Sequence, residues 1–308
     1  MKRVLSFSLA ALAACSNGER RNHAAAPPET PMPLPTATAA PLPLPHIARK
    51  GGTDVTFAVV SDLHFGYGRI EATHELFIDR LNHVQGKPYP AYLQKAWGAA
   101  VGPVRGLLVA GDLTESGTAE QWELLAKTYG LAGDGTGSRV PLFEVIGNHD
   151  HGPGEYVESR VAARHGGGRV YAFQWDDLHV LALGEGPGDD AFAFMERDLA
   201  RVDANVPLLL YFHLPLAGPW STGGWFADGD YRKRLAVVLE GRNVVAIFHG
   251  HHHATDHYTW HGIDVFKPGA VKSGGRECAV VHVTDHQLTV GTYDYVADGW
   301  SHTFAKRF

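Results

Sequence analysis

Five short apolar runs, each followed at once by polar residues, constrain the fold of this 308-residue chain more than any other feature. Each run suits one strand, and apolar residues fill it almost without interruption, which is typical of sheets buried on both faces. The runs are 55–60, 106–110, 141–146, 207–212 and 244–248. Helical patterns lie between them, over 70–82, 118–129, 192–202 and 231–239. The chain is therefore predicted to be an α/β protein.

The C-terminal third has a different pattern. Residues 257–270 alternate around His261-Gly262, and residues 278–295 alternate around Asp285-His286-Gln287. Both segments predict hairpins. Together with the buried strands they predict two mixed sheets packed on each other and flanked by helices, a four-layer α/β/β/α sandwich.

Metal-binding residue types stand directly after each of the five runs. These blocks are Asp62-Leu63-His64, Gly111-Asp112, Gly147-Asn148-His149-Asp150, His213, and His249-Gly250-His251-His252-His253. A single Gly-Asp is usually a turn, but five such blocks in sequence are not explained by turns alone. Ligands of open α/β sheets gather at the carboxyl ends of the strands, and imidazole is the commonest metal ligand. We therefore expect these groups to converge on a metal site at the carboxyl ends.

The ordered set of blocks resembles the calcineurin-like metallophosphoesterase superfamily over almost the whole domain, from Asp62 to His253. The resemblance implies two divalent ions about 3.5–4 Å apart that activate a bridging water and clamp a phosphoryl group. It makes Asp112 the bridging ligand. It assigns Asp62, His64 and His253 to one ion, and Asn148, His213 and His251 to the other. Such ligands accept Mn, Fe, Zn or Co.

The resemblance also makes His149 the catalytic imidazole, which contacts the phosphate and protonates the leaving oxygen. Asp150 is expected to orient that ring, although a helix or turn cap is the alternative. His249 matches no family ligand and is expected to be a buried, hydrogen-bonded histidine beside the site. His252 is expected outside the ligand set or facing solvent.

The resemblance implies a small-molecule phosphate ester as substrate, and the blocks look closer to those of bacterial phosphodiesterases. Leu113 to Gly117 lack the arginine of protein Ser/Thr phosphatases, and Glu115 stands where purple acid phosphatases have a tyrosine. A phosphomonoesterase with the same site is the alternative. A catalytically inactive metal- or phosphate-binding lipoprotein is less favoured, because His149 is retained. A structural zinc site would need more cysteines.

Substrate contacts are expected in the loops. Trp220, Trp225 and Phe226 either wall the pocket or pack as core, and the sequence does not choose between these. Asn82, His83 and Lys87 are candidate phosphate contacts.

The N-terminal sequence predicts a targeting segment. Lys2-Arg3, an apolar stretch and Leu12-Ala13-Ala14-Cys15 predict a lipoprotein signal peptide over 1–14, with a plain secretory signal as the alternative. The Pro/Ala-rich residues 15–52 predict a disordered tether that begins at a lipidated cysteine, and 53–308 the phosphoesterase domain. The protein would be an exported bacterial lipoprotein, attached to a membrane only through its lipid and facing the periplasm or the cell surface.

A net charge of −6 argues against a nucleic-acid partner. The oligomeric state is left open.

Overall fold

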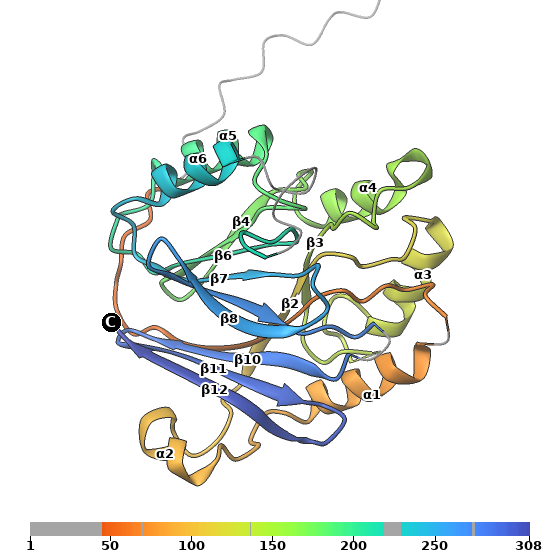
Figure 1. Ribbon diagram of the computed structural model, residues 1–308, viewed down its shortest axis with the longest axis horizontal. Coiled ribbons are helices and arrows are strands. Elements are labelled where there is room, and N and C mark those ends of the chain that lie inside the picture. Colours follow the sequence, from red (N-terminus) through yellow and green to blue (C-terminus); the bar gives the residue numbers. More distant parts are fainter. Residues whose placement is uncertain (1–44, 69, 136, 219–228, 273–274) are drawn as a thin grey trace, which may run out of the picture. The chain divides into compact units, whose positions relative to one another are not determined.

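Two six-stranded sheets form the centre of the folded unit, which spans Leu44–Phe308 (Figure 1). The computed structural model describes residues 45–308 except 69, 136, 219–228 and 273–274. The first sheet has the order β12 (Gly299–Arg307), β11 (Gln287–Asp294), β10 (Glu277–Thr284), β1 (Asp54–Val60), β2 (Val104–Ala110), β3 (Leu142–Val145). The second has the order β4 (Tyr171–Trp175), β5 (Leu178–Ala182), β6 (Leu208–Phe212), β7 (Val244–His249), β9 (Ile263–Pro268), β8 (Thr255–Trp260).

Both sheets are mixed. Strands β1, β2 and β3 run parallel, and β10, β11 and β12 extend this sheet with antiparallel pairs. In the second sheet β5, β6, β7 and β9 run parallel, and β4 and β8 are antiparallel edge strands. The connections between parallel strands include the helices α1 (Glu71–Asn82), α2 (Ala91–Trp97), α3 (Ala119–Tyr129), α5 (Asp189–Leu199) and α6 (Gly229–Leu239). Helix α4 (Tyr156–Arg164) instead links β3 of the first sheet to β4 of the second.

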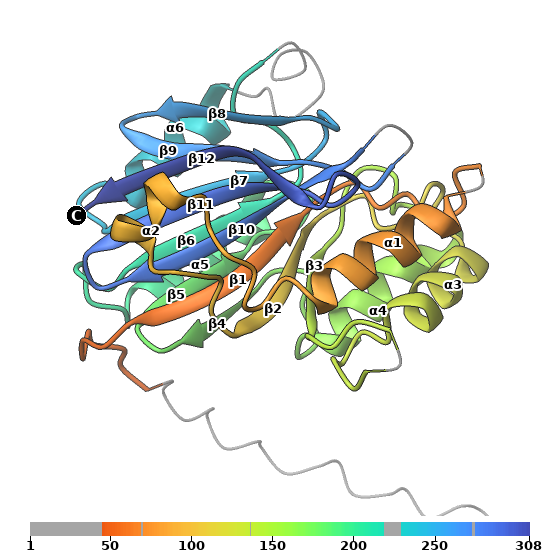
Figure 2. The ribbon, with the colours of Figure 1, turned by 90° about the horizontal axis from the view of Figure 1, so that it is seen from below.

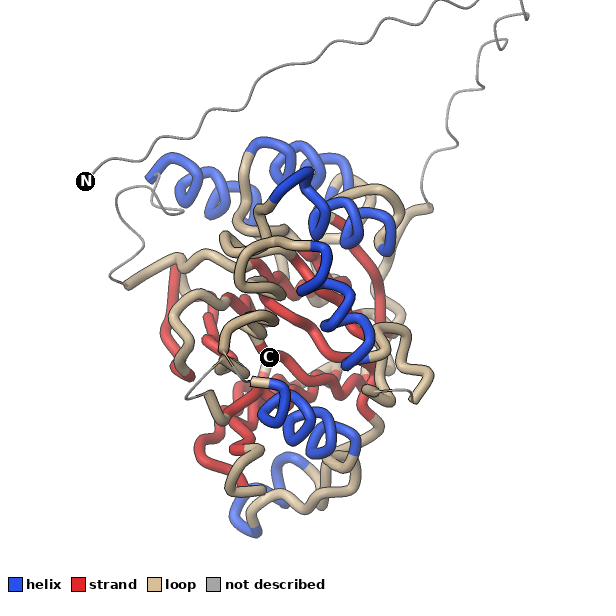
Figure 3. Tube along the Cα trace, turned by 90° about the vertical axis from the view of Figure 1, so that its right-hand side faces the viewer, coloured by secondary structure: helices blue, strands red, loops and turns tan. Residues whose placement is uncertain are grey.

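The alternation of side chains along the strands builds four layers. In β1, Val55, Phe57 and Val59 enter the core between the two sheets, whereas Ala58 and Val60 face the helices. Helices α1, α3 and α4 lie side by side and cover the first sheet (Figure 2). Helices α5 and α6 cover the second sheet, so that the strands lie between helices on opposite sides (Figure 3). The predicted four-layer sandwich of two mixed sheets is confirmed.

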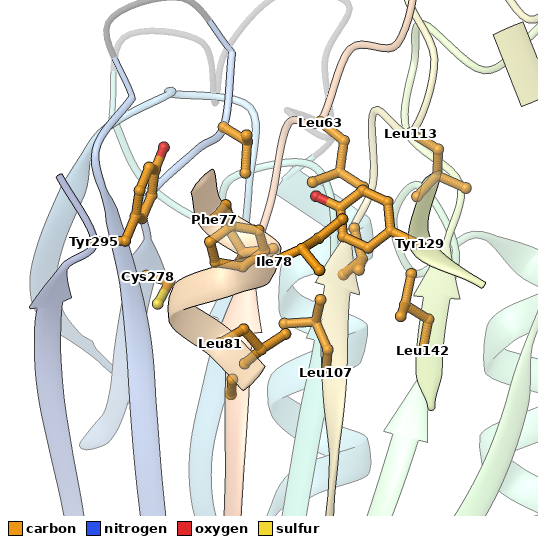
Figure 4. Close-up of a cluster of buried hydrophobic side chains, with 14 of the residues drawn as sticks. Leu63, Phe77, Ile78, Leu81, Leu107, Leu113, Tyr129, Leu142, Cys278 and Tyr295 are labelled. Atoms are coloured by element: carbon orange, nitrogen blue, oxygen red, sulfur yellow. The ribbon is translucent and has the colours of Figure 1, made fainter. Parts of the chain in front are cut away.

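The core beneath α1 shows how a helix is fixed on the first sheet. Phe77, Ile78 and Leu81 point from α1 onto Leu107 of β2 and its neighbours (Figure 4). All of these side chains are at most 7% exposed. Burial of each stabilises the fold by roughly 1.5–3 kcal/mol. Helix α1 follows the carboxyl end of β1 and runs back along the sheet, so its last residues lie far from that end.

Residues 45–53 form a strap along the domain rather than the end of a tether. Ile47 pairs with Val202, since its amide donates to Arg201 O at 2.7 Å and its carbonyl accepts from Asp203 N at 2.9 Å. Further along, the amide of Lys50 donates to Asp177 Oδ2 at 2.6 Å. The predicted boundary at residue 53 is therefore too late. Residues 1–14 and most of 15–52 lie outside the described residues.

Among the helices that the structure describes, none has the length and apolar character needed to cross a membrane.

Candidate metal centre

The ends of five strands bring all seven predicted ligands to one place. The turns after β1 and β2 are joined by the amide of Asp62, which donates to Gly111 O at 3.0 Å. The ends of β6 and β7 are joined by the amide of Gly250, which donates to His213 O at 3.0 Å. A hydrogen bond from His213 Nδ1 to Ala110 O at 2.9 Å connects the two sheets. The predicted convergence at the carboxyl ends is confirmed.

One group of side chains consists of Asp62, His64, Asp112 and His253. His253 Nε2 lies 3.2 Å from Asp62 Oδ1 and 3.2 Å from His64 Nε2. His64 Nε2 lies 3.4 Å from Asp112 Oδ2. Four ligand atoms from three strand ends therefore face one small volume.

The second group shares Asp112 and adds His213, His251 and Asn148. His213 Nε2 lies 3.2 Å from Asp112 Oδ2 and 3.0 Å from Asn148 Oδ1. His251 Nδ1 lies 3.0 Å from the same Asn148 oxygen. Each group has the residues that the sequence assigned to one ion.

The atom that belongs to both groups is Asp112 Oδ2. It is buried and accepts no hydrogen bond from any residue that the structure describes. The other oxygen, Oδ1, accepts from the amide of His149 at 2.9 Å. A buried carboxylate oxygen without a hydrogen bond is costly, and divalent cations between imidazole and carboxylate ligands would satisfy it. The donor set therefore fits divalent metal ions.

Hydrogen bonds on the far side of two rings set their tautomers. His64 Nδ1 lies 2.7 Å from Glu115 Oε2, and His213 Nδ1 lies 2.9 Å from Ala110 O. A carboxylate or carbonyl oxygen only accepts, so Nδ1 carries the hydrogen in both rings. When these rings are neutral, their Nε2 lone pairs point into the cluster, as in histidine metal ligands.

Burial keeps two of the histidines neutral. It lowers the pKa of His64 to about 4, and burial together with the charge of His213 lowers the pKa of His251 to about 4. Burial also disfavours charge on His213, but the Asp112 carboxylate raises the pKa of His213 to about 9. A metal ion would have to displace this proton, because only a neutral imidazole coordinates.

The cluster opens to solvent on one side. The side chains of Asp62, His64, Asp112 and His213 are at most 1% exposed, whereas those of His149 and His253 are 36% and 38% exposed. The ring of His149 lies 4.7 Å from that of His64, centroid to centroid. A phosphate ester approaching the cluster would therefore meet His149.

The predicted role of Asp150 as the partner of His149 is wrong. The Asp150 carboxylate is fully buried and accepts from the amides of Leu113, Thr114 and Gly147 at 2.8–3.0 Å. It holds the turns after β2 and β3, which agrees with the alternative of a cap. The His149 ring instead donates Nδ1–H to the backbone carbonyl of Glu115 at 2.9 Å.

The two remaining histidines of the last block lie outside both groups. His249 is fully buried, with its ring nitrogens 3.0 Å from Gly250 O and 2.8 Å from the Tyr258 hydroxyl, which confirms its predicted role. Burial lowers the pKa of His249 to about 3. His252 is half-buried, with its ring beside those of His249 and His251.

The candidate phosphate contacts do not belong to the cluster. Asn82 binds the backbone of Gly137 and Arg139, and Lys87 pairs with Asp298 at 2.8 Å. Asn82 is the last residue of α1, and His83 caps the helix. Twelve helical residues place both about 18 Å from the start of α1, and α1 follows the loop that carries Asp62 and His64. Trp220, Trp225 and Phe226 lie outside the described residues.

Sequence reasoning missed Glu115 and Lys272. Glu115 touches both His64 and His149, and the Lys272 ammonium lies 3.7 Å from the Glu115 carboxylate. The only sequence clue to Glu115 is its position three residues after Asp112, and Lys272 has none.

The calcineurin-like phosphoesterase family model matches residues 55–255. No curated protein matches the chain. Similar solved structures include the purple acid phosphatase PPD1 of yellow lupin (14% identity, 84% of this chain and 55% of that one, TM-score 0.58). They also include GAP50 of Plasmodium, the anchor in its inner membrane complex (10%, 83% and 89%, 0.55), and PhoD (12%, 86% and 71%, 0.52). At these identities the likeness shows the fold, and this chain spans about half of the lupin protein's length, 55%.

Two mixed sheets carry Asp, Asn and His side chains at their strand ends, and this donor set could hold divalent metal ions. The chain belongs to the calcineurin-like phosphoesterase family.

Proposed function

We propose that this protein is a phosphodiesterase whose site holds two divalent ions bridged by Asp112. The observation that carries the proposal is Asp112 Oδ2, buried without a hydrogen bond from a described residue and within 3.4 Å of one histidine nitrogen from each group. Such ions neutralise phosphoryl oxygens and lower the pKa of a water molecule. We assign Asp62, His64 and His253 to one ion, and Asn148, His213 and His251 to the other.

His149 is proposed to supply the proton that the leaving oxygen needs. Its Nδ1–H is donated to Glu115 O, so Nε2 is the nitrogen that can hold the transferred proton. Its half-exposed ring stands at the open side of the cluster, where an ester would lie. Asp150 supports this geometry by holding the turn after β3, because its carboxylate accepts from the amide of Gly147, two residues before His149.

The preference for diesters rests on the blocks SDLHFG, GDLTESGTAEQW and GNHD, which resemble those of bacterial phosphodiesterases. The substrate is proposed to be a small molecule, with no nucleic-acid partner. The similar structures include a purple acid phosphatase, which supports a phosphate-ester substrate in general.

The deciding experiment uses metal-free protein reloaded in turn with Mn, Fe, Zn or Co. It measures hydrolysis of matched phosphomonoesters, phosphodiesters and phospholipid head groups. We expect at least one metal to support diester turnover above monoester turnover. The opposite ratio would identify a phosphomonoesterase, and metal binding without turnover on any ester would identify a binding protein.

Asp112→Asn is the matched control for the metals. Because one carboxylate serves both ions, we expect this variant to lose both metal occupancy and activity while its circular dichroism spectrum stays unchanged. Elemental analysis that finds a single ion per wild-type chain under metal-replete conditions would rule out the two-metal arrangement.

We further propose that residues 1–14 are a lipoprotein signal peptide and that Cys15 is lipidated, which would anchor the protein to a membrane facing the periplasm or the cell surface. The support is the Leu12-Ala13-Ala14-Cys15 sequence ahead of a Pro/Ala-rich segment. Mass spectrometry of the mature N-terminus should find a diacylated Cys15, and Cys15→Ser should release the protein from the membrane fraction. An unmodified N-terminus further along the chain would contradict lipidation.

A further inference from the structure

Glu115 touches two of the histidines on which the proposed function depends, and it does so with different atoms. Its carboxylate Oε2 lies 2.7 Å from Nδ1 of His64. Its backbone carbonyl accepts from Nδ1 of His149 at 2.9 Å. Its carboxylate is farther from His149, with Oε1 4.0 Å from Nδ1. The side chain therefore acts on a metal ligand, and the main chain acts on the proton donor.

We propose that Glu115 is the positioning residue that couples metal binding to proton donation. The carboxylate holds the His64 ring with Nε2 toward the cluster and makes that nitrogen a stronger donor to a cation. The carbonyl fixes the His149 ring in the tautomer that leaves Nε2 for the substrate. This inference rests on the proposed metal role of His64.

The main chain of Glu115 is held by the turn after β1. The amide of Glu115 donates to Phe65 O at 2.9 Å, and the amide of Phe65 donates to Leu113 O at 3.1 Å. The amide of His64 donates to Asp112 O at 2.9 Å. The two turns are thus paired residue by residue, so the carbonyl that holds His149 moves only if the ligand loops move as well.

Lys272 lies beside the Glu115 carboxylate. Its ammonium is 3.7 Å from Oε2 and 4.4 Å from the centre of the Tyr67 ring, and its amide donates to Asp62 O at 3.0 Å. The Lys272 ammonium and His64 Nδ1 both lie near the same carboxylate oxygen, Oε2, at 3.7 and 2.7 Å. The ammonium therefore attracts the oxygen that His64 binds and favours the carboxylate orientation seen here.

The separation of side-chain and main-chain roles gives a sharp test with Glu115→Gln. The glutamine keeps the length and an acceptor oxygen but loses the charge. We expect metal affinity to fall about 10–100-fold, as for other partners of metal-binding histidines. The carbonyl is unchanged, so at saturating metal the ratio of rates for good and poor leaving groups should equal that of the wild type.

The matched control is Asp264→Asn. Asp264 is another poorly exposed carboxylate that binds a histidine, with Oδ1 2.9 Å from His257 Nε2, and it contacts none of the proposed ligands. We expect this variant to bind metal as the wild type does. Glu115→Asp keeps the charge on a shorter side chain and should recover part of the affinity that glutamine loses.

Metal binding is measured by titrating metal-free full-length protein with Co²⁺ against a competing chelator and following the visible absorption of the bound ion. Unchanged affinity in Glu115→Gln, or an equal loss in Asp264→Asn, would overturn the side-chain role. A changed leaving-group ratio at saturating metal would overturn the main-chain role. If Glu115→Gln does not fold, Glu115→Asp decides, since wild-type affinity there contradicts the proposal. Wild-type protein that binds no Co²⁺ would instead refute the proposed function.

Discussion

Backbone strain is concentrated at the proposed ligands. Five of them adopt positive φ, a region that residues other than glycine rarely occupy. They are Asp62 (54°), His64 (48°), Asp112 (52°), His251 (72°) and His253 (51°). Each such residue costs of order 1 kcal/mol or more, and such costs persist where the surroundings over-determine the conformation. Half of the ten non-glycine residues with positive φ in the described chain are these proposed ligands, so the fold gives up stability where it positions them.

His149 provides the residue-scale prediction. If it donates the leaving-group proton, His149→Ala should keep both metals and lose about 10²–10⁴-fold in kcat, the usual contribution of general acid catalysis. The loss should be greatest for alkyl alcohols, which need the proton, and smallest for nitrophenolate, which departs as an anion. The measurement is kcat across a series of leaving groups at saturating metal.

Elemental analysis and thermal unfolding of the same His149→Ala samples serve as controls. Because the His149 side chain is half-exposed, we expect little change in stability. An equal loss for all leaving groups, with metals and fold intact, would exclude the acid role.

At the scale of elements, the sequence predicts most reliably what is apolar and continuous. The five predicted strands and both hairpins are present, because their burial pattern is carried by the residues themselves. Strand β12 was not predicted, since its residues are exposed or only partly buried and show no apolar alternation. Helices α2 and α4 were not predicted either; α4 begins just after Pro153-Gly154, which disrupts the pattern. The hairpin of β4 and β5 was also not predicted, although β5 is apolar and fully buried.

The site follows the same rule. The seven ligands were predictable because metal-binding residue types directly follow recognisable strands. Glu115 was not predictable, because its contact with His64 depends on the pairing of two turns that are about 50 residues apart in sequence. The Asp150 interpretation failed for a similar reason, since its partners are backbone amides that a sequence pattern does not reveal.

Gly111, the residue after β2, gives the prediction at this scale. It has φ +83°, and a Cβ there would lie 2.6 Å from the His213 ring. Gly111→Ala should destabilise the protein by about 1 kcal/mol for the backbone conformation plus about 1–3 kcal/mol for overpacking. It should also weaken metal binding, because the displaced ring is a proposed ligand.

Gly86→Ala separates the two costs. Gly86 has a similar φ of +79°, but a Cβ there would meet no atom within 4 Å. Its variant should show the conformational cost alone in chemical denaturation, with unchanged metal affinity. Equal metal affinity in both variants would mean that His213 is not a ligand or that its ring adapts without cost.

At the scale of the whole domain, the strap of residues 45–53 lies at the pole opposite the metal cluster. It enters β1 at Asp54, whereas the cluster follows the other end of this seven-residue strand, about 20 Å away. The strap contacts both sheets, through Val202 and Asp177 beside the second and Asp285 beside the first. It therefore joins the sheets at the end where the strands of the cluster begin.

Removal of this strap should cost stability without affecting the metals. Net hydrogen bonds contribute about 0.5–1.5 kcal/mol each, and those to charged groups more. Loss of the bonds to Arg201, Asp177 and Asp285 should thus lower the free energy of unfolding by about 2 kcal/mol or more. The comparison is a chain that begins at residue 45 with one that begins at residue 54, in chemical denaturation and metal titration. We expect a lower midpoint for the shorter chain, the same metal affinity for both, and intermediate stability for Asp177→Asn in the longer chain. Equal midpoints would show that the strap is not part of the folded domain, and a loss of metal affinity would show that the two poles are coupled.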